Sequence, residues 1–178
     1  MHASSVMPER ILVVYYTRTG TTQQLARWIA AAVDADLERI VDLRKRTGML
    51  GYLRSGWEAG MRRVVPIEPP VRDPTQYDLV VIGTPIWAES VASPVRSYLE
   101  THRNELRTVA FFCTCGGRGD ARVFAQMEQL CGVKPISTLT VRESMIEDCA
   151  RSVEKFAAAI SRRAPGAPAP FVAPPPAP

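Results

Sequence analysis

Apolar residues along this chain alternate between short continuous runs and longer stretches with helical spacing. Short runs predict strands that are buried on both faces, whereas apolar residues three and four positions apart predict amphipathic helices. The first run, residues 11–16, is followed by a stretch whose apolar side chains share one helical face. These side chains are Leu25, Trp28, Ile29, Ala32 and Val33. A strand that leads directly into a helix is therefore the first predicted unit.

The same alternation continues along the chain. Further strands are predicted at residues 37–41, 78–85, 108–113 and 135–141, the last of them a more polar edge strand. Further helices are predicted from Pro94, from Gly119 or Asp120 to Gly132, and from about Glu143 to Arg163. Strands and helices at these spacings favour right-handed βαβ units. The predicted fold class is α/β, a three-layer αβα sandwich around a five-stranded parallel sheet.

Two segments depart from the alternation. Residues 43–70 keep a helical apolar stripe but include several glycines, so an irregular helix and a Pro-rich connection are expected there. Residues 164–178 contain seven prolines and no charged side chain, a composition typical of an extended, disordered tail. The predicted organisation is one domain at residues 1–163 and a Pro/Ala-rich tail at 164–178.

Composition narrows the functional classes. With 178 residues, 46% apolar and 22% charged, and a net charge of +4, the chain is typical of an ordinary globular domain. No concentrated basic face predicts nucleic-acid binding, although six basic residues between 44 and 63 form either a solvated helix face or a surface for an acidic partner. No apolar run could span a membrane, and no signal peptide is visible, so a cytoplasmic protein is expected. The four cysteines lack metal-site spacing and predict reduced thiols.

A hydroxyl-rich turn joins the first strand to its helix. Its residues are Thr17, Arg18, Thr19, Gly20, Thr21 and Thr22. Backbone N–H groups at a helix N-terminus lack intrahelical partners, and the helix dipole adds partial positive charge, so this turn can hold a phosphate. Gly20 permits a close approach that a Cβ would obstruct. The alternative is a capped turn without a ligand.

The pattern of Thr17, Thr19, Gly20 and Thr22 after an apolar strand resembles the phosphate loop of flavodoxin-like proteins. Such loops hold the 5′-phosphate of FMN with hydroxyls and amides. The resemblance implies the strand order 2-1-3-4-5, in which the site lies at the carboxyl ends of the strands around the switch point between strands 1 and 3.

Two further loops at this edge fit a flat ligand. After the third strand come Pro85, Ile86, Trp87 and Ala88, and the indole on this loop is suited to stacking on a ring. After the fourth strand come Thr114, Cys115, Gly116, Gly117 and Gly119, whose glycines let main-chain amides approach a ring edge. The alternatives are an aromatic residue of a protein interface and a plain turn.

The resemblance covers residues 9–163 and implies FMN, with its isoalloxazine between these two loops. Two departures from the family weigh against a dedicated low-potential electron shuttle. The chain is net basic, whereas many flavodoxins are acidic around the flavin. The loop after the fourth strand also lacks the aromatic and acidic residues of electron-carrying flavodoxins.

Three functions remain open at this point. The first is electron transfer through a non-covalently bound FMN to a redox partner protein. The second is an FMN-containing oxidoreductase that takes hydride from NAD(P)H and reduces a quinone or another small acceptor. The third is a flavin-free interaction module of the same fold.

Three other classes of protein are excluded by their motifs. A receiver domain is excluded because Thr84 and Pro85 end the third strand. P-loop proteins and serine hydrolases are excluded because the sequence has neither the nucleotide loop nor the nucleophile elbow. The electron donor, the acceptor and the oligomeric state are not encoded in any motif.

Overall fold

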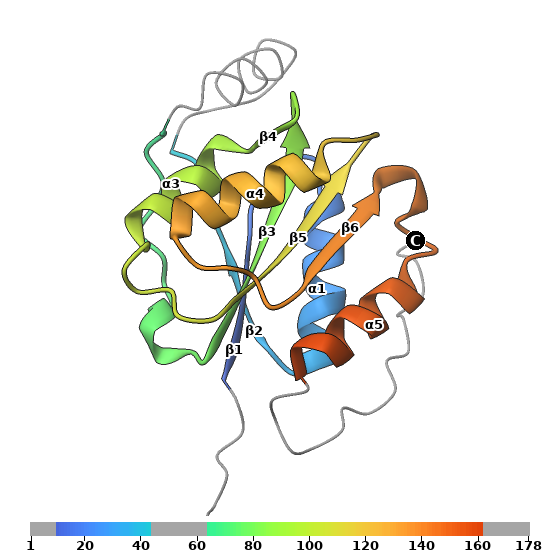
Figure 1. Cartoon of the computed structure of the whole chain (residues 1–178), viewed down its shortest axis with the longest axis horizontal. Helices are drawn as coiled ribbons and strands as arrows, with labels where there is room; N and C mark the ends of the chain where they lie inside the picture. The colour runs from blue at the N-terminus through green and yellow to red at the C-terminus, as the bar shows by residue number, and fades with distance from the viewer. Residues whose placement is uncertain (1–9, 44–63, 162–178) are drawn as a thin grey trace, which may run out of the picture.

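The computed structural model describes residues 10–43 and 64–161. Within these residues the parallel strands are β1 (Ile11–Tyr15), β2 (Asp36–Arg39), β3 (Leu79–Trp87), β5 (Val109–Cys115) and β6 (Thr138–Arg142). They form one sheet in the order β2-β1-β3-β5-β6 (Figure 1). A short strand, β4 (Ser90–Val91), runs antiparallel to the end of β3. Counted without β4, the order is the predicted 2-1-3-4-5, and the predicted fold class is confirmed.

Helices cover both faces of the sheet. Helices α1 (Thr21–Val33) and α5 (Ala150–Ser161) pack on one face, and α3 (Ser93–Thr101) and α4 (Asp120–Cys131) pack on the other (Figure 1). Strand β1 shows how the sequence supplies both interfaces. Its Ile11 and Val13 belong to the core under α1 and α5, while Leu12 and Val14 belong to the core under α3 and α4. The continuous apolar run therefore reflects burial on both faces.

Strand β3 is longer than predicted because Pro85 does not end it. Gly83 is the last β3 residue paired with β1, opposite Tyr15, whereas Pro85 is paired with Thr114 of β5. The nitrogen of Pro85 faces the side that β1 has already left. A proline there removes no ladder hydrogen bond, and the strand continues to Trp87.

Three other strand boundaries differ by two or three residues from the predicted ones. Strand β2 ends before Val41, because the Val41 carbonyl accepts a hydrogen bond from the Glu68 N–H at 2.9 Å and the chain leaves the sheet. Strand β5 continues two residues past its predicted end, to Cys115. Strand β6 begins at Thr138, beyond Pro135, which has no N–H to donate to the sheet.

The last helix begins later than predicted. Residues 143–148 were expected to form its first turns, but Glu143–Met145 form a 3-10 turn and α5 starts at Ala150. The buried apolar face begins only at Cys149 and continues through Val153, Phe156, Ala157 and Ile160. The residues before Cys149 have no such face, and a helix without one lacks the packing that stabilises it.

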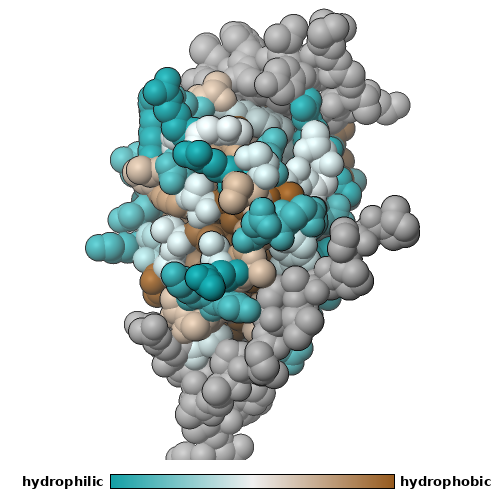
Figure 2. Space-filling view, turned by 90° about the vertical axis from the view of Figure 1, so that its right-hand side faces the viewer, coloured by the Kyte–Doolittle hydropathy of each residue, from teal (hydrophilic) through white to brown (hydrophobic). Residues whose placement is uncertain are grey.

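The outer surface of the layer formed by α1 and α5 is mixed in polarity. Figure 2 views the molecule from the side of α1 and α5, where the hydrophobic colour is confined to small areas between hydrophilic side chains of the described residues. Among these residues no helix combines the length and apolarity needed to cross a bilayer. The basic segment 44–63, most of the irregular helix expected at 43–70, and the tail at 164–178 lie outside the described residues.

Candidate functional site

The loop after β1 folds into a tight turn at the start of α1. The Thr17 hydroxyl is buried and accepts a hydrogen bond from the Gly20 N–H at 3.0 Å. Gly20 caps the helix with a positive φ of 101°, and its carbonyl accepts the first helical bond, from the Gln24 N–H at 2.9 Å. The N–H groups of residues 21–23 precede this first bond and therefore point out of the helix end. The start of α1 therefore presents outward N–H groups, and binding of an anion there stays a prediction.

Among the described residues, the space directly in front of Gly20 is open. A Cβ built on this glycine would meet no atom within 4 Å. Around it, Thr19 is exposed, Arg18 and Thr21 are half-buried, and Thr22 is buried. Open space, outward N–H groups and hydroxyls together fit a phosphate group.

One hydrogen bond joins the first loop to the third. The Thr22 and Thr114 hydroxyl oxygens lie 2.7 Å apart, and both side chains are buried. Thr114 is a residue of β5, paired with Pro85 on one side and Val141 on the other. Three segments, those that follow the first, third and fourth predicted strands, therefore lie at one edge of the sheet. This is expected for the carboxyl ends of parallel strands.

The segment after Pro85 was expected to be a loop, and this expectation is wrong. Ile86 pairs with Val91 and Trp87 pairs with Ser90, so the chain forms a tight β-hairpin. Its two turn residues, Ala88 and Glu89, have positive φ values of 46° and 54°. Such turns match the twist of the strands, but Asn and Gly normally occupy them. Non-glycine residues in this conformation are strained, and strain of this kind clusters at functional sites.

The hairpin brings Trp87 beside the first loop. The Trp87 ring meets the Tyr16 ring edge to face, with centroids 5.7 Å apart. The Arg18 guanidinium lies over the same indole, 5.9 Å from its centroid. The indole is half-buried and thus accessible on part of its surface. Stacking of Trp87 on a flat ring stays a prediction.

Gln126 of α4 anchors the hairpin. Its side-chain oxygen accepts from the Ser90 hydroxyl at 2.9 Å and from the Val91 N–H at 3.3 Å, and its amide nitrogen donates to the Glu89 carbonyl at 3.5 Å. Sequence reasoning missed this residue. The available signal was its position three residues after Val123, which makes Gln126 a polar side chain on the inward face of the helix.

The glycines of the third loop differ in what surrounds them. Gly116 and Gly117 are exposed, and a Cβ on either would meet no atom within 4 Å. Gly119 caps α4 with φ 107°, and a Cβ there would lie 3.2 Å from the Glu89 side chain. The third loop therefore packs against the hairpin turn through Gly119 and stays open at Gly116 and Gly117.

Charged side chains also join these two segments. The Glu89 carboxylate lies 3.8 Å from the Arg118 guanidinium and 3.6 Å from that of Arg122. Arg118 is 93% exposed, so its charge faces solvent at the rim of the site. Exposed pairs of this kind add little stability, and their effect is mainly on charged ligands that approach.

The chain resembles known proteins in sequence and in fold. The flavodoxin family model matches residues 10–140. The chain belongs to the flavodoxin family. No curated protein matches it.

Solved structures of three proteins illustrate how the fold of this flavodoxin family member recurs. A flavoprotein of Lactobacillus acidophilus NCFM, solved with FMN, is 20% identical with a TM-score of 0.66, over 79% of this chain and 97% of that chain. A Bacteroides eggerthii protein provisionally classed as a flavoprotein is 25% identical with a TM-score of 0.68, over 82% and 98%. Two-electron reduced Megasphaera elsdenii flavodoxin is 19% identical with a TM-score of 0.56, over 84% and 97%.

The thiols of this family member are structural rather than reactive. All four cysteines are buried, and all four are free thiols, as the sequence predicted. Burial raises the pKa of Cys113 to about 12 and also raises the pKa of Cys115, next to the candidate site. Because the thiolate is the nucleophile, these thiols are poor nucleophiles at neutral pH. In the described ranges no group of His, Cys, Asp or Glu is arranged to hold a metal ion.

Proposed function

We propose that this chain binds FMN non-covalently and transfers electrons through it. The observation that carries the proposal is the joining of the α1 N-terminus to Thr114 of β5 through Thr22. It supports a phosphate position at residues 17–22, where outward amides, hydroxyls and the open space at Gly20 fit an anion. When bound, FMN supplies the redox chemistry, and the chain orients it and tunes its potential.

The ring of FMN would lie between the hairpin and the third loop. Two features support this position. Trp87 is half-buried beside Arg18, so part of the indole is free for stacking. Gly116 and Gly117 leave open space above β5, where main-chain amides can reach the edge of a ring.

The charges near this position argue for a higher potential than that of acidic flavodoxins. Arg18 lies over Trp87, and Arg118 and Arg122 share one carboxylate, that of Glu89. Positive charge beside a flavin stabilises its anionic reduced form relative to the oxidised form. Reduction would accordingly be easier than in a site lined by carboxylates.

An NAD(P)H-dependent oxidoreductase is the second candidate. It is favoured by Arg118, whose exposed guanidinium beside the third loop could bind a phosphate of the dinucleotide. In this case the acceptor would be a quinone or a similar small molecule. If the chain instead only transfers electrons, its partner would be a redox protein.

The test is an absorbance spectrum of the purified protein, followed by titration of the FMN-free protein with FMN. A flavin spectrum, or saturable binding with one FMN per chain, supports the proposal. A colourless protein that does not bind added FMN overturns it. If the protein binds FMN, sustained NAD(P)H oxidation with a quinone selects the oxidoreductase. Reduction of an electron-transfer protein without such turnover selects the electron-transfer function.

A further inference from the structure

One face of helix α4 lies against the hairpin that carries Trp87. Gly119, Arg122 and Gln126 follow one another at intervals of three and four residues, so they share this face. The Arg122 guanidinium lies 3.6 Å from the Glu89 carboxylate, and a Cβ on Gly119 would lie 3.2 Å from the same side chain. Gln126 lies further along the helix and binds the two residues of β4. Helix α4 therefore contacts the hairpin both at its turn and along its second strand.

The turn of this hairpin is strained. Ala88 and Glu89 have φ values of 46° and 54°, and neither is the Asn or Gly that a two-residue turn of this kind favours. Residues in this conformation persist only where the surrounding structure fixes them. The hairpin therefore depends on contacts from outside its own sequence.

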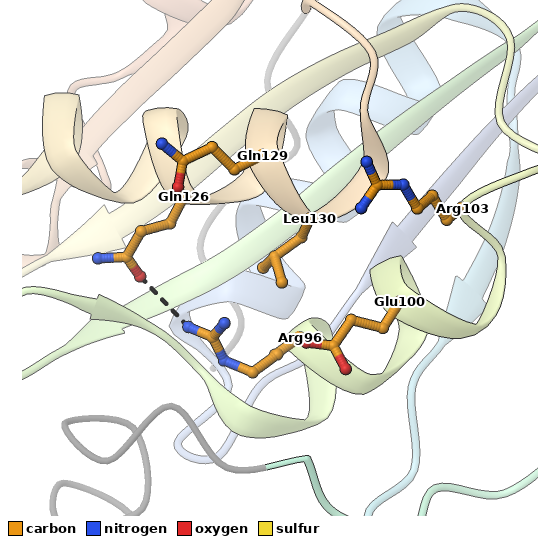
Figure 3. Close-up of a pocket in the computed structure, with 6 residues that line it drawn as sticks. All are labelled: Arg96, Glu100, Arg103, Gln126, Gln129 and Leu130. Carbon is orange, nitrogen blue, oxygen red and sulfur yellow. Dashed lines mark hydrogen bonds between the residues drawn. The ribbon is translucent and has the colours of Figure 1, made fainter.

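Gln126 supplies buried contacts of this kind. It is 8% exposed, and Figure 3 shows its side chain projecting from α4 toward α3. Its oxygen accepts from the Ser90 hydroxyl at 2.9 Å and from the Val91 N–H at 3.3 Å, and both of these residues are buried. The ion pairs of Glu89 join exposed groups and add little stability. Of the contacts between α4 and the hairpin, those of Gln126 therefore stabilise the hairpin most.

The contacts of Gln126 bear directly on the place of Trp87. Ser90, which donates to Gln126, is paired with Trp87 across the hairpin. Gln126 thus holds the second strand of the hairpin against α4, and this strand fixes the first strand with its indole. At its other end α4 begins beside Gly119, where the glycine-rich loop ends. One helix therefore connects the two segments between which we place the flavin ring.

We propose that Gln126 is a positioning residue for flavin binding, because it holds the Trp87 indole in the place where the ring stacks. This role rests on the proposed function, and Gln126 acts through the hairpin rather than by touching the flavin. An indole that is already held in place loses little freedom when a ring binds, whereas a mobile indole adds an ordering cost to binding. Flavin affinity should therefore fall when Gln126 no longer holds the hairpin.

Titration of the flavin-free protein with FMN and with riboflavin tests this role. Gln126→Met keeps the length of the side chain but removes its hydrogen bonds. Ser90→Ala is a milder variant that removes one of these bonds from the side of the hairpin. Gln129→Met is the matched control, because this glutamine is exposed on the same helix. Each substitution is also made in Trp87→Ala, and circular dichroism shows which variants are folded.

Gln126→Met should lower the affinity for FMN and for riboflavin by the same factor, roughly threefold to tenfold, because the two ligands share the ring. Ser90→Ala should lower both affinities by a smaller factor, and Gln129→Met should change them less than about twofold. In Trp87→Ala, Gln126→Met should have less than about a twofold further effect, since the indole that it positions is gone. Unchanged affinity in Gln126→Met overturns the role, as does an equal loss with and without Trp87. If Gln126→Met does not fold, Ser90→Ala decides by the same criteria.

A second arm replaces the strained turn. Ala88→Asn together with Glu89→Gly introduces the residues that favour positive φ, so the hairpin should no longer depend on Gln126. In this background Gln126→Met should change flavin affinity less than about twofold. A loss as large as that with the original turn would show that Gln126 does not act through the hairpin, and it would overturn the proposal.

A third measurement uses no flavin. In protein labelled with fluorotryptophan, the fluorine NMR signal of Trp87 is assigned by its absence in Trp87→Phe. This signal should shift or broaden in Gln126→Met, while that of the core residue Trp28 should not. Identical Trp87 signals in wild type and Gln126→Met overturn the positioning role whether or not the chain binds FMN. A wild type that binds neither flavin, with a Trp87 signal that does change, overturns the proposed function and confines Gln126 to holding the hairpin.

Discussion

The hydroxyl oxygens of Thr22 and Thr114 lie 2.7 Å apart, although the two residues are 92 positions apart in sequence. Thr22 belongs to the first turn of α1 and Thr114 to the end of β5. Their hydrogen bond fixes the anion turn relative to the glycine-rich loop. The turn that we assign to the phosphate of FMN and the loop that we assign to its ring are thereby held at a fixed distance from each other.

Replacing either of these threonines with valine should destabilise the protein. The remaining hydroxyl would be buried without its partner, at a cost of about 1–3 kcal/mol in the free energy of unfolding. The double variant Thr22→Val, Thr114→Val should lose less than the sum of the two, because neither hydroxyl is then left unpaired. Urea denaturation of all four proteins measures this coupling. Strictly additive losses would show that the two hydroxyls do not interact.

Gly83 should be intolerant of even one added methyl group. A Cβ there would lie 2.0 Å from the Phe112 Cζ, and that ring is fully buried. We expect Gly83→Ala to lower the free energy of unfolding by about 3 kcal/mol. Gly116→Ala is the matched control, because its Cβ would meet nothing within 4 Å, and its effect should stay within about 0.5 kcal/mol. Similar unfolding midpoints for the two variants would be inconsistent with this packing.

Trp87→Ala should weaken FMN binding by roughly 1–2 kcal/mol, about tenfold, through loss of stacking. Trp87→Phe keeps a flat ring and should recover most of the affinity. Both values come from quenching of flavin fluorescence on titration. If Trp87→Ala binds FMN as tightly as wild type does, the ring does not lie against this indole.

Stability should fall at alkaline pH through Cys113. Burial raises the pKa of this thiol from about 9 to about 12, so it stays neutral in the folded protein while the unfolded chain begins to ionise. Its contribution is fully present below about pH 9 and is lost as the pH rises toward about 12. In urea denaturation between these values under reducing conditions, wild type should lose stability more steeply than Cys113→Val. Parallel pH dependences would rule out this contribution.

The sequence predicted the layers of the fold because the relevant signal is local. The run 11–16 and the stripe through Leu25 and Ile29 each specify a buried face without reference to distant residues. The turn at Gly20 could also be predicted from local sequence, since a glycine and several hydroxyl residues lie there between a strand and a helix. Whether the predicted site residues bind FMN is a separate question that the fold does not answer.

The hairpin at Ala88 and Glu89 could not be predicted in the same way. Neither residue carries the Asn or Gly signal of such a turn, and the hairpin depends on tertiary contacts. Gln126 holds it from another element 35 residues beyond Val91, and Gly119 packs against its turn. Likewise, Pro85 was predicted to end its strand because a proline has no N–H to donate. Only the strand register shows that β1 has already ended on the side that the Pro85 nitrogen faces.

The most direct test of the account compares FMN with riboflavin, which lacks the phosphate, in wild type and in two glycine variants. Gly20→Val and Gly132→Val each place a β-branched residue at a positive φ, 101° and 75°, so both carry backbone strain, but only Gly20 lies at the proposed phosphate turn. We predict that wild type and Gly132→Val bind FMN at least about tenfold more tightly than riboflavin, and that Gly20→Val loses this preference. Equal affinities of wild type for FMN and riboflavin, or an unchanged preference in Gly20→Val, would contradict the phosphate site on which the proposed function depends.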